Sequence, residues 1–205
     1  MTAPLEFYFD FSSPYAYIGA MRIDELAARH GRSVDWRPML LGVALKATGS
    51  QPLTGYPLKG QYSTRDFARS AREYGIPFKM PTRFPIPTQA AARAVLWLKQ
   101  HDTAGAANRA VPFAKAAYTA LFVNDTDISA PEAVLSVAEK LGIDRAALAA
   151  GIEDPAIKDA LRAQTDEAVH QRGVFGAPFV FVDGEPFWGA DRFEMIERWL
   201  KRGGW

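Results

Sequence analysis

The chain has 205 residues, of which 48% are hydrophobic and 23% are charged, which fits a globular protein of one domain or of one domain with a large insertion. Its 24 Lys and Arg residues nearly balance 23 Asp and Glu residues, and no block of like charge appears, which argues against nucleic-acid binding. The chain contains no cysteine, so disulfides, protein thiolates and cysteine-ligated metals are excluded and any thiol chemistry has to come from a small molecule.

The first forty residues predict a strand, a helix and a second strand. Residues 5–11 alternate between apolar and polar side chains, as a half-buried strand does. Apolar residues at helical spacing follow from residue 14 to His30, and Gly31 is a candidate for the C-terminal cap of that helix. Residues 33–38 favour a second strand. This opening has the length and order of a βαβ unit.

The middle of the chain predicts a block of helices. Ser63 with Asp66, and Ser129 with Glu132, have the spacing of N-terminal capping boxes. Several prolines between residues 77 and 87 predict an irregular, extended loop. The expected helices span residues 62–75, 88–101, 106–122, 129–142, 144–150 and 155–171.

The end of the chain returns to β-structure. Residues 179–182 form a short apolar run, Asp183 and Gly184 are a hairpin turn signal, and residues 185–188 form the return strand. An amphipathic helix follows. The order βαβ, helical block, ββα predicts an α/β fold in which the two outer parts share one mixed sheet and the helical block is inserted between them.

Four segments, in this order along nearly the whole chain, carry a resemblance to the thioredoxin superfamily. Within it, the chain resembles the branch that contains the bacterial periplasmic disulfide oxidoreductases, the kappa-class glutathione transferases and the 2-hydroxychromene-2-carboxylate isomerases, and it looks closest to the isomerases. One departure is Pro87, where these isomerases often have Asn. The four segments are residues 9–15, 36–42, 173–178 and 187–192.

The resemblance implies a thioredoxin-like fold with a discontinuous domain of residues 1–40 and 172–205 and an all-helical insertion domain of residues 41–171. It also implies a homodimeric, glutathione-dependent isomerase that converts 2-hydroxychromene-2-carboxylate, a small aromatic carboxylate, to trans-o-hydroxybenzylidenepyruvate in the degradation of aromatic compounds. Because the sequence shows no signal-peptide pattern and no membrane-spanning apolar run, a cytoplasmic location without membrane attachment is expected. The three histidines lack ligand-like spacing, so no metal site is expected.

Ser13 has two compatible interpretations. A Ser followed by Pro is a common pair at the N-cap and first position of a helix. The resemblance implies a second role, because Ser13 stands where the oxidoreductases have a reactive cysteine. There its hydroxyl would donate a hydrogen bond that keeps glutathione as the thiolate, favoured by the helix dipole. By the same alignment, Ser12 is interpreted as structural.

Pro178 is either a strand-initiating proline or a cis proline. In the superfamily, the cis proline exposes the backbone of the residue before it, here Ala177, to the cysteinyl backbone of glutathione. Asp191 can cap the last helix or bind the γ-glutamyl amino group, while Ala190 would offer backbone N–H groups to the γ-glutamyl carboxylate. The cofactor-binding residues implied by the resemblance are Ser13, Ala177, Pro178, Trp188, Gly189, Ala190 and Asp191.

Two lysines are candidates for binding the carboxylates of the substrate and of glutathione. Lys46 and Lys59 lie between the second strand and the helical block, where the family places basic residues, although most lysines are simply solvated. Weaker candidates for the same site are Tyr62, Arg83 and Trp97.

Three other functions compete with the isomerase. A kappa-like glutathione transferase would use the same thiolate and release a conjugate. A thioredoxin-like module that binds glutathione or a peptide would lack catalysis altogether. A disulfide oxidoreductase requires a protein thiol, which this chain does not have.

Overall fold

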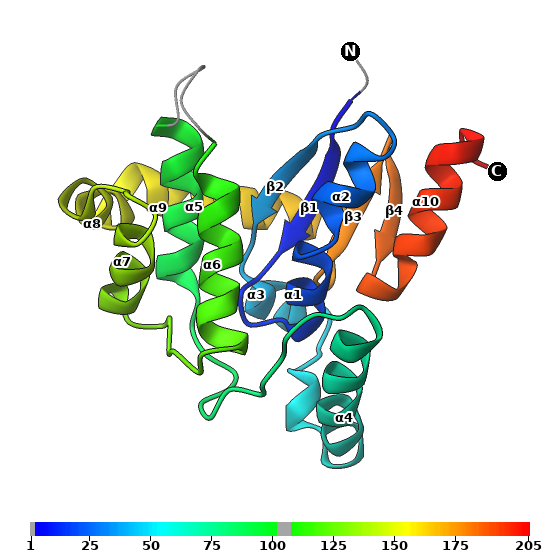
Figure 1. Cartoon of the computed structure of the whole chain (residues 1–205), viewed down its shortest axis with the longest axis horizontal. Helices are drawn as coiled ribbons and strands as arrows, with labels where there is room; N and C mark the ends of the chain where they lie inside the picture. Colours follow the sequence, from blue (N-terminus) through cyan, green and yellow to red (C-terminus); the bar gives the residue numbers. More distant parts are fainter. Residues whose placement is uncertain (1–2, 102–107) are drawn as a thin grey trace.

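The computed structural model describes residues 3–101 and 108–205. The sheet formed by these residues has four strands, β1 (Leu5–Phe9), β2 (Val34–Pro38), β3 (Phe179–Val182) and β4 (Glu185–Trp188), in the order β2-β1-β3-β4. β1 is parallel to β2 and antiparallel to β3, and β3 is antiparallel to β4. The predicted mixed sheet is confirmed, and the two ends of the chain meet where β1 pairs with β3 (Figure 1).

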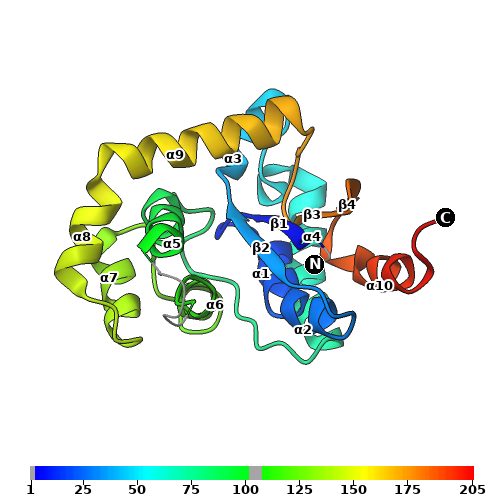
Figure 2. The same cartoon turned by 90° about the horizontal axis from the view of Figure 1, so that it is seen from above.

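Helices cover the sheet and extend well beyond its β2 edge. α1 (Pro14–Ala20) and α2 (Ile23–Ala28) lie over the sheet, and α10 (Phe193–Arg202) packs beside α2 (Figure 1). α9 (Pro155–Asp166) leads from the helical block back to the sheet (Figure 2). The other helices are α3 (Leu41–Ala47), α4 (Pro57–Glu73), α5 (Gln89–His101), α6 (Ala110–Phe122), α7 (Pro131–Glu139) and α8 (Arg145–Glu153), with the short turns η1 (Leu53–Gly55), η2 (Glu167–Gln171) and η3 (Ala190–Arg192).

The alternation in β1 divides the core between the two faces of the sheet. Phe7 and Phe9 pack edge-on against Trp36 of β2, with ring centroids 5.0 and 5.3 Å apart. The same cluster continues into the helical block through Tyr118 of α6. On the other face, Tyr8 packs with side chains of α3, η2 and β3. Since each fully buried aromatic side chain contributes about 1.5–3 kcal/mol, this alternation fixes both faces of the strand.

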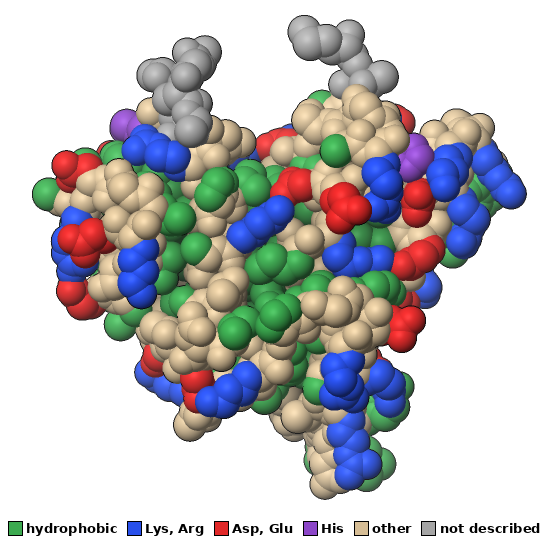
Figure 3. Space-filling view, in the orientation of Figure 1, with side chains coloured by type: hydrophobic (Ala, Val, Ile, Leu, Met, Phe, Trp, Pro, Cys, Tyr) green, Lys and Arg blue, Asp and Glu red, His purple; other side chains and the backbone are tan. Residues whose placement is uncertain are grey.

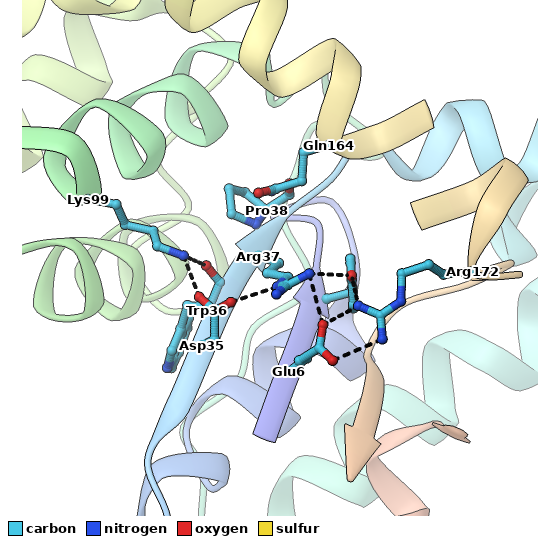
Figure 4. Close-up of polar contacts among 9 residues, drawn as sticks. Glu6, Asp35, Trp36, Arg37, Pro38, Lys99, Gln164 and Arg172 are labelled. Atoms are coloured by element: carbon cyan, nitrogen blue, oxygen red, sulfur yellow. Dashed lines mark hydrogen bonds and ion pairs between the residues drawn. The ribbon is translucent and has the colours of Figure 1, made fainter. Parts of the chain in front are cut away.

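Polar contacts attach the helical block to the sheet (Figure 4). Lys99 of α5 donates to the Asp35 carboxylate at 2.5 Å and to the carbonyl oxygen of Trp36 at 2.8 Å. Gln164 of α9 donates to the carbonyl oxygen of Pro38 at 2.5 Å. The contacts therefore cover the edge strand β2 and give partners to two of its carbonyl groups.

Several helix boundaries differ from the sequence-based prediction. The single helix expected up to His30 is divided into α1 and α2, and α3 was not predicted at all. α4 begins at Pro57 rather than at residue 62, because proline suits the first turn of a helix. Gly60 then permits a close approach, since a Cβ there would lie 2.7 Å from the carbonyl oxygen of Thr54.

The predicted capping boxes are wrong. Ser63 lies inside α4, where its hydroxyl donates to the carbonyl oxygen of Gly60 at 3.0 Å. The N-cap of α7 is Ala130 rather than Ser129, and no side chain caps that helix. Asp191 does not cap the last helix either, because it lies within η3 and the N-cap of α10 is Arg192.

The remaining boundaries follow the prediction more closely. The stretch 155–171 is α9 continued by the π-helical turn η2, and the hairpin between β3 and β4 turns at Asp183 and Gly184, both with positive φ. The predicted start at residue 106 lies outside the described residues, and α6 is described from Ala110.

Acidic and basic side chains are interspersed on the face of the molecule that Figure 3 shows, which agrees with the formal net charge of +1. Within the described ranges, no helix is both long and apolar enough to cross a membrane. The same residues contain no group of three or more His, Asp or Glu side chains that could hold a metal ion.

Candidate functional site

A cavity of about 1230 Å³ opens where β1 ends and α1 begins. Its walls come from segments far apart in the sequence: the β1–α1 connection, α3 with the chain up to η1, α4, residues 84–89, and the two segments 175–177 and 188–192. The tertiary structure therefore gathers the segments that carried the sequence resemblance around one space. Ligand pockets commonly measure about 300–1,000 Å³, so this cavity has room for a small-molecule ligand.

Ser13 lies at the floor of the cavity and is the N-cap of α1, as the sequence predicted. Its backbone is extended, with φ −115° and ψ 112°, and its Oγ accepts a hydrogen bond of 3.1 Å from the N–H of Ala16. The same hydroxyl donates to the carbonyl oxygen of Ala177 at 2.9 Å. One buried hydroxyl thus connects the N-terminus of α1, where the helix dipole favours negative charge, to the second half of the fold.

The peptide bond between Ala177 and Pro178 is cis, the second of the two interpretations that the sequence left open. Ala177 lines the cavity, whereas Pro178 packs behind it on α1, 3.3 Å from the position that a Cβ of Gly19 would occupy. The carbonyl oxygen of Pro178 accepts a hydrogen bond of 3.0 Å from Gly189. This bond places the proline segment and the segment after β4 side by side at the cavity.

The segment after β4 forms the adjoining wall. Trp188, Ala190 and Asp191 line the cavity, as does Gly189, whose φ of 109° other residues rarely adopt. A Cβ at Gly189 would also lie 2.3 Å from the Asp191 carboxylate, so a side chain there would make that carboxylate shift. Arg192, which the sequence did not single out, pairs with Asp191 at 3.1 Å and lines the cavity too.

An exposed pair of aromatic side chains belongs to this part of the cavity wall. Phe175 and Trp188 pack edge-to-face with ring centroids 4.8 Å apart, and both remain substantially exposed. The indole Nε1 lies 2.4 Å from the position that a Cβ of Gly176 would occupy, so this glycine lets Trp188 close over the chain before Ala177. The pair offers an apolar surface beside the cavity floor.

Asp10 organises the floor from below and was missed by the sequence reasoning. Its buried carboxylate accepts hydrogen bonds from the N–H of Ser12 at 2.7 Å, from the N–H of Leu41 at 2.7 Å and from the hydroxyl of Thr88 at 3.0 Å. Burial raises the pKa of this carboxyl above its usual value, although the three hydrogen bonds oppose the rise. Asp10 thereby joins three cavity walls through one buried carboxyl group, and no local sequence signal marks it.

A second acid, Asp66 of α4, also lines the cavity and was not predicted as a site residue. The Tyr15 hydroxyl donates to it at 2.6 Å, and Arg69 forms an ion pair with it. Although burial opposes the change, the hydrogen bonds from these two side chains hold the pKa of Asp66 below its usual value. Burial raises the pKa of the Tyr15 phenol, and the same hydrogen bond to Asp66 raises it further.

The two predicted lysines are placed differently. Lys59, near the start of α4, lines the cavity and holds its Nζ 5.1 Å from the centre of the Tyr56 ring. Lys46 lies in the last turn of α3, outside the residues that line the cavity. Pro87, the departure from the isomerase pattern, lies on the cavity wall just before Thr88.

The weaker candidates lie outside the cavity wall. Tyr62 is exposed on α4 beside Arg69. Arg83 pairs with Asp127 at 2.7 Å, and Trp97 stacks on His101 within the helical block. These contacts give each of the three side chains a structural partner away from the cavity.

Comparisons with known proteins agree with this geometry. Residues 4–201 match the model of a protein family described as the DSBA-like thioredoxin domain. The chain is 32% identical to a 2-hydroxychromene-2-carboxylate isomerase of Sphingobium xenophagum over 98% of this chain and 99% of that protein. It is 27% identical to glutathione S-transferase kappa 1 of Rattus norvegicus over 96% of this chain and 92% of that protein. A solved structure of a 2-hydroxychromene-2-carboxylate isomerase superposes with a TM-score of 0.84 at 27% identity, covering 97% of this chain and 94% of the other.

Proposed function

Because this chain belongs to the family of DSBA-like thioredoxin domains, we propose that it is a glutathione-dependent isomerase that converts 2-hydroxychromene-2-carboxylate to trans-o-hydroxybenzylidenepyruvate. The observation that carries the proposal is the position of Ser13. In a chain without cysteine, a hydroxyl lies at the N-terminus of α1, hydrogen-bonded to the residue before a cis proline and facing the cavity. The similarity to isomerases over the full length supports the same reaction class.

The residues around the cavity fit the chemistry of glutathione, which carries a thiol, an amino group and two carboxylates. Lys59 and Arg192 supply positive charge for carboxylates, and Asp66 and Asp191 supply negative charge for the amino group. The Ala177 backbone lies next to the Ser13 hydroxyl, so a strand-like pairing of the cysteinyl backbone there would bring the sulfur toward Ser13.

In this proposal, glutathione supplies a thiolate that adds to the conjugated carbon of the substrate and leaves again after rotation about the former double bond. Ser13 donates a charge-assisted hydrogen bond to the sulfur, and the N-terminus of α1 favours the anionic form. Lys59 attracts the substrate carboxylate, while Leu41, Phe84 and Ile86 provide an apolar wall for the aromatic ring. The protein gains and loses no electrons, consistent with a chain that has no redox-active thiol.

The proposal is tested by mixing the protein with glutathione and the chromene carboxylate. We expect glutathione-dependent formation of the trans product with no net consumption of glutathione, measured by chromatography of both compounds. Calorimetry that detects no glutathione binding at millimolar concentration would contradict the proposal and would favour a module without catalysis.

A kappa-like glutathione transferase is the second candidate, because kappa-class relatives match 96% of the chain. Incubating the protein with glutathione and an electrophilic aryl halide distinguishes the transferase from the isomerase. Stoichiometric loss of glutathione to a conjugate, with no isomerisation of the chromene carboxylate, would favour the transferase. The homodimer and the cytoplasmic location stay predictions, to be checked by sedimentation and by cell fractionation.

A further inference from the structure

Three residues with hydroxyl groups, Ser12, Ser13 and Thr88, lie near Asp10 at the cavity floor. They differ in whether the hydroxyl hydrogen already has an acceptor in the protein. The hydroxyl of Ser13 donates to the carbonyl oxygen of Ala177, and that of Thr88 donates to the Asp10 carboxylate. The Oγ of Ser12 accepts a hydrogen bond of 3.2 Å from the N–H of Ile86. Its own hydrogen has no acceptor among the residues that the structure describes. Ser12 therefore has a donor available for a ligand.

The two adjacent serines face different walls of the cavity. Ser13 is directed to Ala177, whereas the contact with Ile86 places the hydroxyl of Ser12 at the wall formed by residues 84–88. Ser12 is also fixed in position, since its N–H donates to Asp10 at 2.7 Å. A hydrogen-bond donor that is held at both ends loses little conformational freedom when it meets a ligand.

The surroundings of Ser12 strengthen an interaction with a developing negative charge. Phe84, Ile86 and Leu41 line the same part of the cavity, and Ser12 itself is half-buried. An apolar setting lowers the local dielectric, so a hydrogen bond to an anionic oxygen contributes more there than in water.

We infer that Ser12 is a catalytic residue that donates a hydrogen bond to the ketone oxygen of an aromatic 2-oxo acid, on the opposite side of the reacting carbon from Ser13; this rests on the proposed function. The hemiketal ring of the chromene carboxylate first opens to the cis 2-oxo acid: the ring C–O bond breaks, the ketone C=O forms, and the hydroxyl proton passes to the phenol oxygen. Addition of a thiolate to the carbon β to the ketone then forms one C–S bond and, through the conjugated system, moves the electron pair of the C=C bond onto the ketone oxygen. Expulsion of the thiolate returns that pair, so no proton, electron or leaving group is gained or lost. The oxygen that carries the charge between these two steps is the one that Ser12 meets.

The test compares the binding of two non-reactive acids without glutathione. 2-Oxo-4-phenylbutanoate carries the ketone oxygen, and 4-phenylbutanoate lacks it while keeping the ring and the carboxylate. For the wild-type protein we expect calorimetry to show about fivefold to tenfold tighter binding of the oxo acid, the effect of one hydrogen bond. Ser12→Ala should bind the two acids equally, whereas Ser12→Thr should keep the preference.

Controls separate this role from a structural one. Ser136→Ala makes the same chemical change on α7, where the hydroxyl donates to the carbonyl oxygen of Glu132, and should leave the preference intact. If Ser12 only supports the chain at Ile86, Ser12→Ala should weaken the binding of both acids by the same factor. Such an equal loss of affinity, with the preference for the oxo acid retained, overturns the inference. Wild-type protein that binds the two acids equally also overturns it.

The turnover of Ser12→Ala gives a second readout. We expect glutathione binding to stay as in the wild type, with kcat for isomerisation reduced about tenfold to a hundredfold, because one donor to a developing oxyanion is lost. An unchanged kcat would contradict the inference. A wild-type protein that prefers the oxo acid but shows no glutathione-dependent isomerisation would contradict the proposed function alone.

Discussion

At the scale of single residues, the hydrogen-bond partners of each buried polar group determine which donors the site can offer to a ligand. The Ser13 hydroxyl donates to Ala177, so it has to rotate about its C–O bond to donate to a bound sulfur. Such a rotation exchanges a neutral hydrogen bond for a charge-assisted one, which is the stronger of the two. Under the proposed function, Ser13 thus combines a helix cap with a hydrogen-bond donor for the glutathione thiolate.

The first prediction concerns Ser13→Ala. We expect the pKa of bound glutathione, followed by thiolate absorbance, to rise toward the usual thiol value of about 8.5, and kcat to fall strongly at neutral pH. The fold should persist, since loss of an N-cap costs about 1 kcal/mol of the free energy of unfolding. Full activity of the variant would show that Ser13 does not serve the sulfur.

The second prediction concerns the pH dependence of stability at Asp10. Because burial raises its pKa in the folded protein, the folded protein binds this proton at a higher pH than the unfolded chain, where the pKa is about 3.9. Between the two values the free energy of unfolding falls as the pH rises. Asp10→Asn removes this contribution.

The wild type should therefore gain stability relative to Asp10→Asn as the pH is lowered from neutrality toward about 4, the range set by the unfolded value. Urea denaturation of both proteins across this range measures the difference. A difference that stays constant with pH, or that changes in the opposite direction, would mean that Asp10 does not carry a raised pKa.

At the scale of secondary-structure elements, one arginine attaches the segment between η2 and β3 to β1. Arg172, the residue after η2, contacts both carboxylate oxygens of Glu6 on β1 and donates to the Tyr8 hydroxyl at 2.8 Å (Figure 4). Its guanidinium also lies 4.2 Å from the centre of the Phe181 ring. The hydrogen bond from Arg172 lowers the pKa of Glu6, so the pair is charged at neutral pH.

The third prediction is that Arg172→Met raises the KM for glutathione several-fold and changes kcat little, because the segment that ends at Ala177 loses one of its attachments to the sheet, the contacts of Arg172 with Glu6 and Tyr8. The stability cost should be about 1–3 kcal/mol, since both side chains are mostly buried and Arg172 donates to a charged group. Steady-state kinetics at varied glutathione concentration measures the split. Arg162→Met, which breaks an exposed pair with Asp159 on α9, serves as the control. Equal effects of the two variants on KM would argue against this positioning role.

At the scale of the whole molecule, one hydrophobic core runs from the sheet into the helical block. Phe9 of β1 and Tyr118 of α6 belong to the same buried cluster as Leu148 of α8. The division into residues 1–40 with 172–205 and residues 41–171 stays a prediction, and because the core crosses it we propose that the two parts do not unfold separately. A shared core makes unfolding cooperative.

The fourth prediction uses the contact between α5 and α8. A Cβ at Gly151 would lie 2.2 Å from the Trp97 ring, so Gly151→Ala forces these helices apart and should cost about 1–3 kcal/mol. Calorimetry should show a single transition at a lower temperature. Gly42→Ala in α3 is the matched control, since a Cβ there meets nothing within 4 Å. Two separate transitions for Gly151→Ala would show that the parts unfold independently.

Local sequence patterns were sufficient for the strands and for part of the site. Three features depend on neighbouring residues alone. They are the alternation that forms β1, the turn at Asp183 and Gly184, and the start of α1 at Ser13 and Pro14. The capping box predicted at Ser63 failed because a serine within a helix can bond the preceding turn, as Ser63 does. The helix α3 was missed because it is short and its packing against η2 compensates for a weak local pattern.

The sequence by itself determined that this protein has no thiol of its own, that its two ends form a mixed sheet, and that a serine begins the first helix. Only the tertiary structure decided which side chains share the cavity. It placed Lys59 there and Lys46 outside, and it brought in Asp10 and Asp66. The physical reason is that a hydrogen bond between residues a hundred positions apart depends on how the elements pack, whereas caps, turns and alternation depend on the nearest few residues.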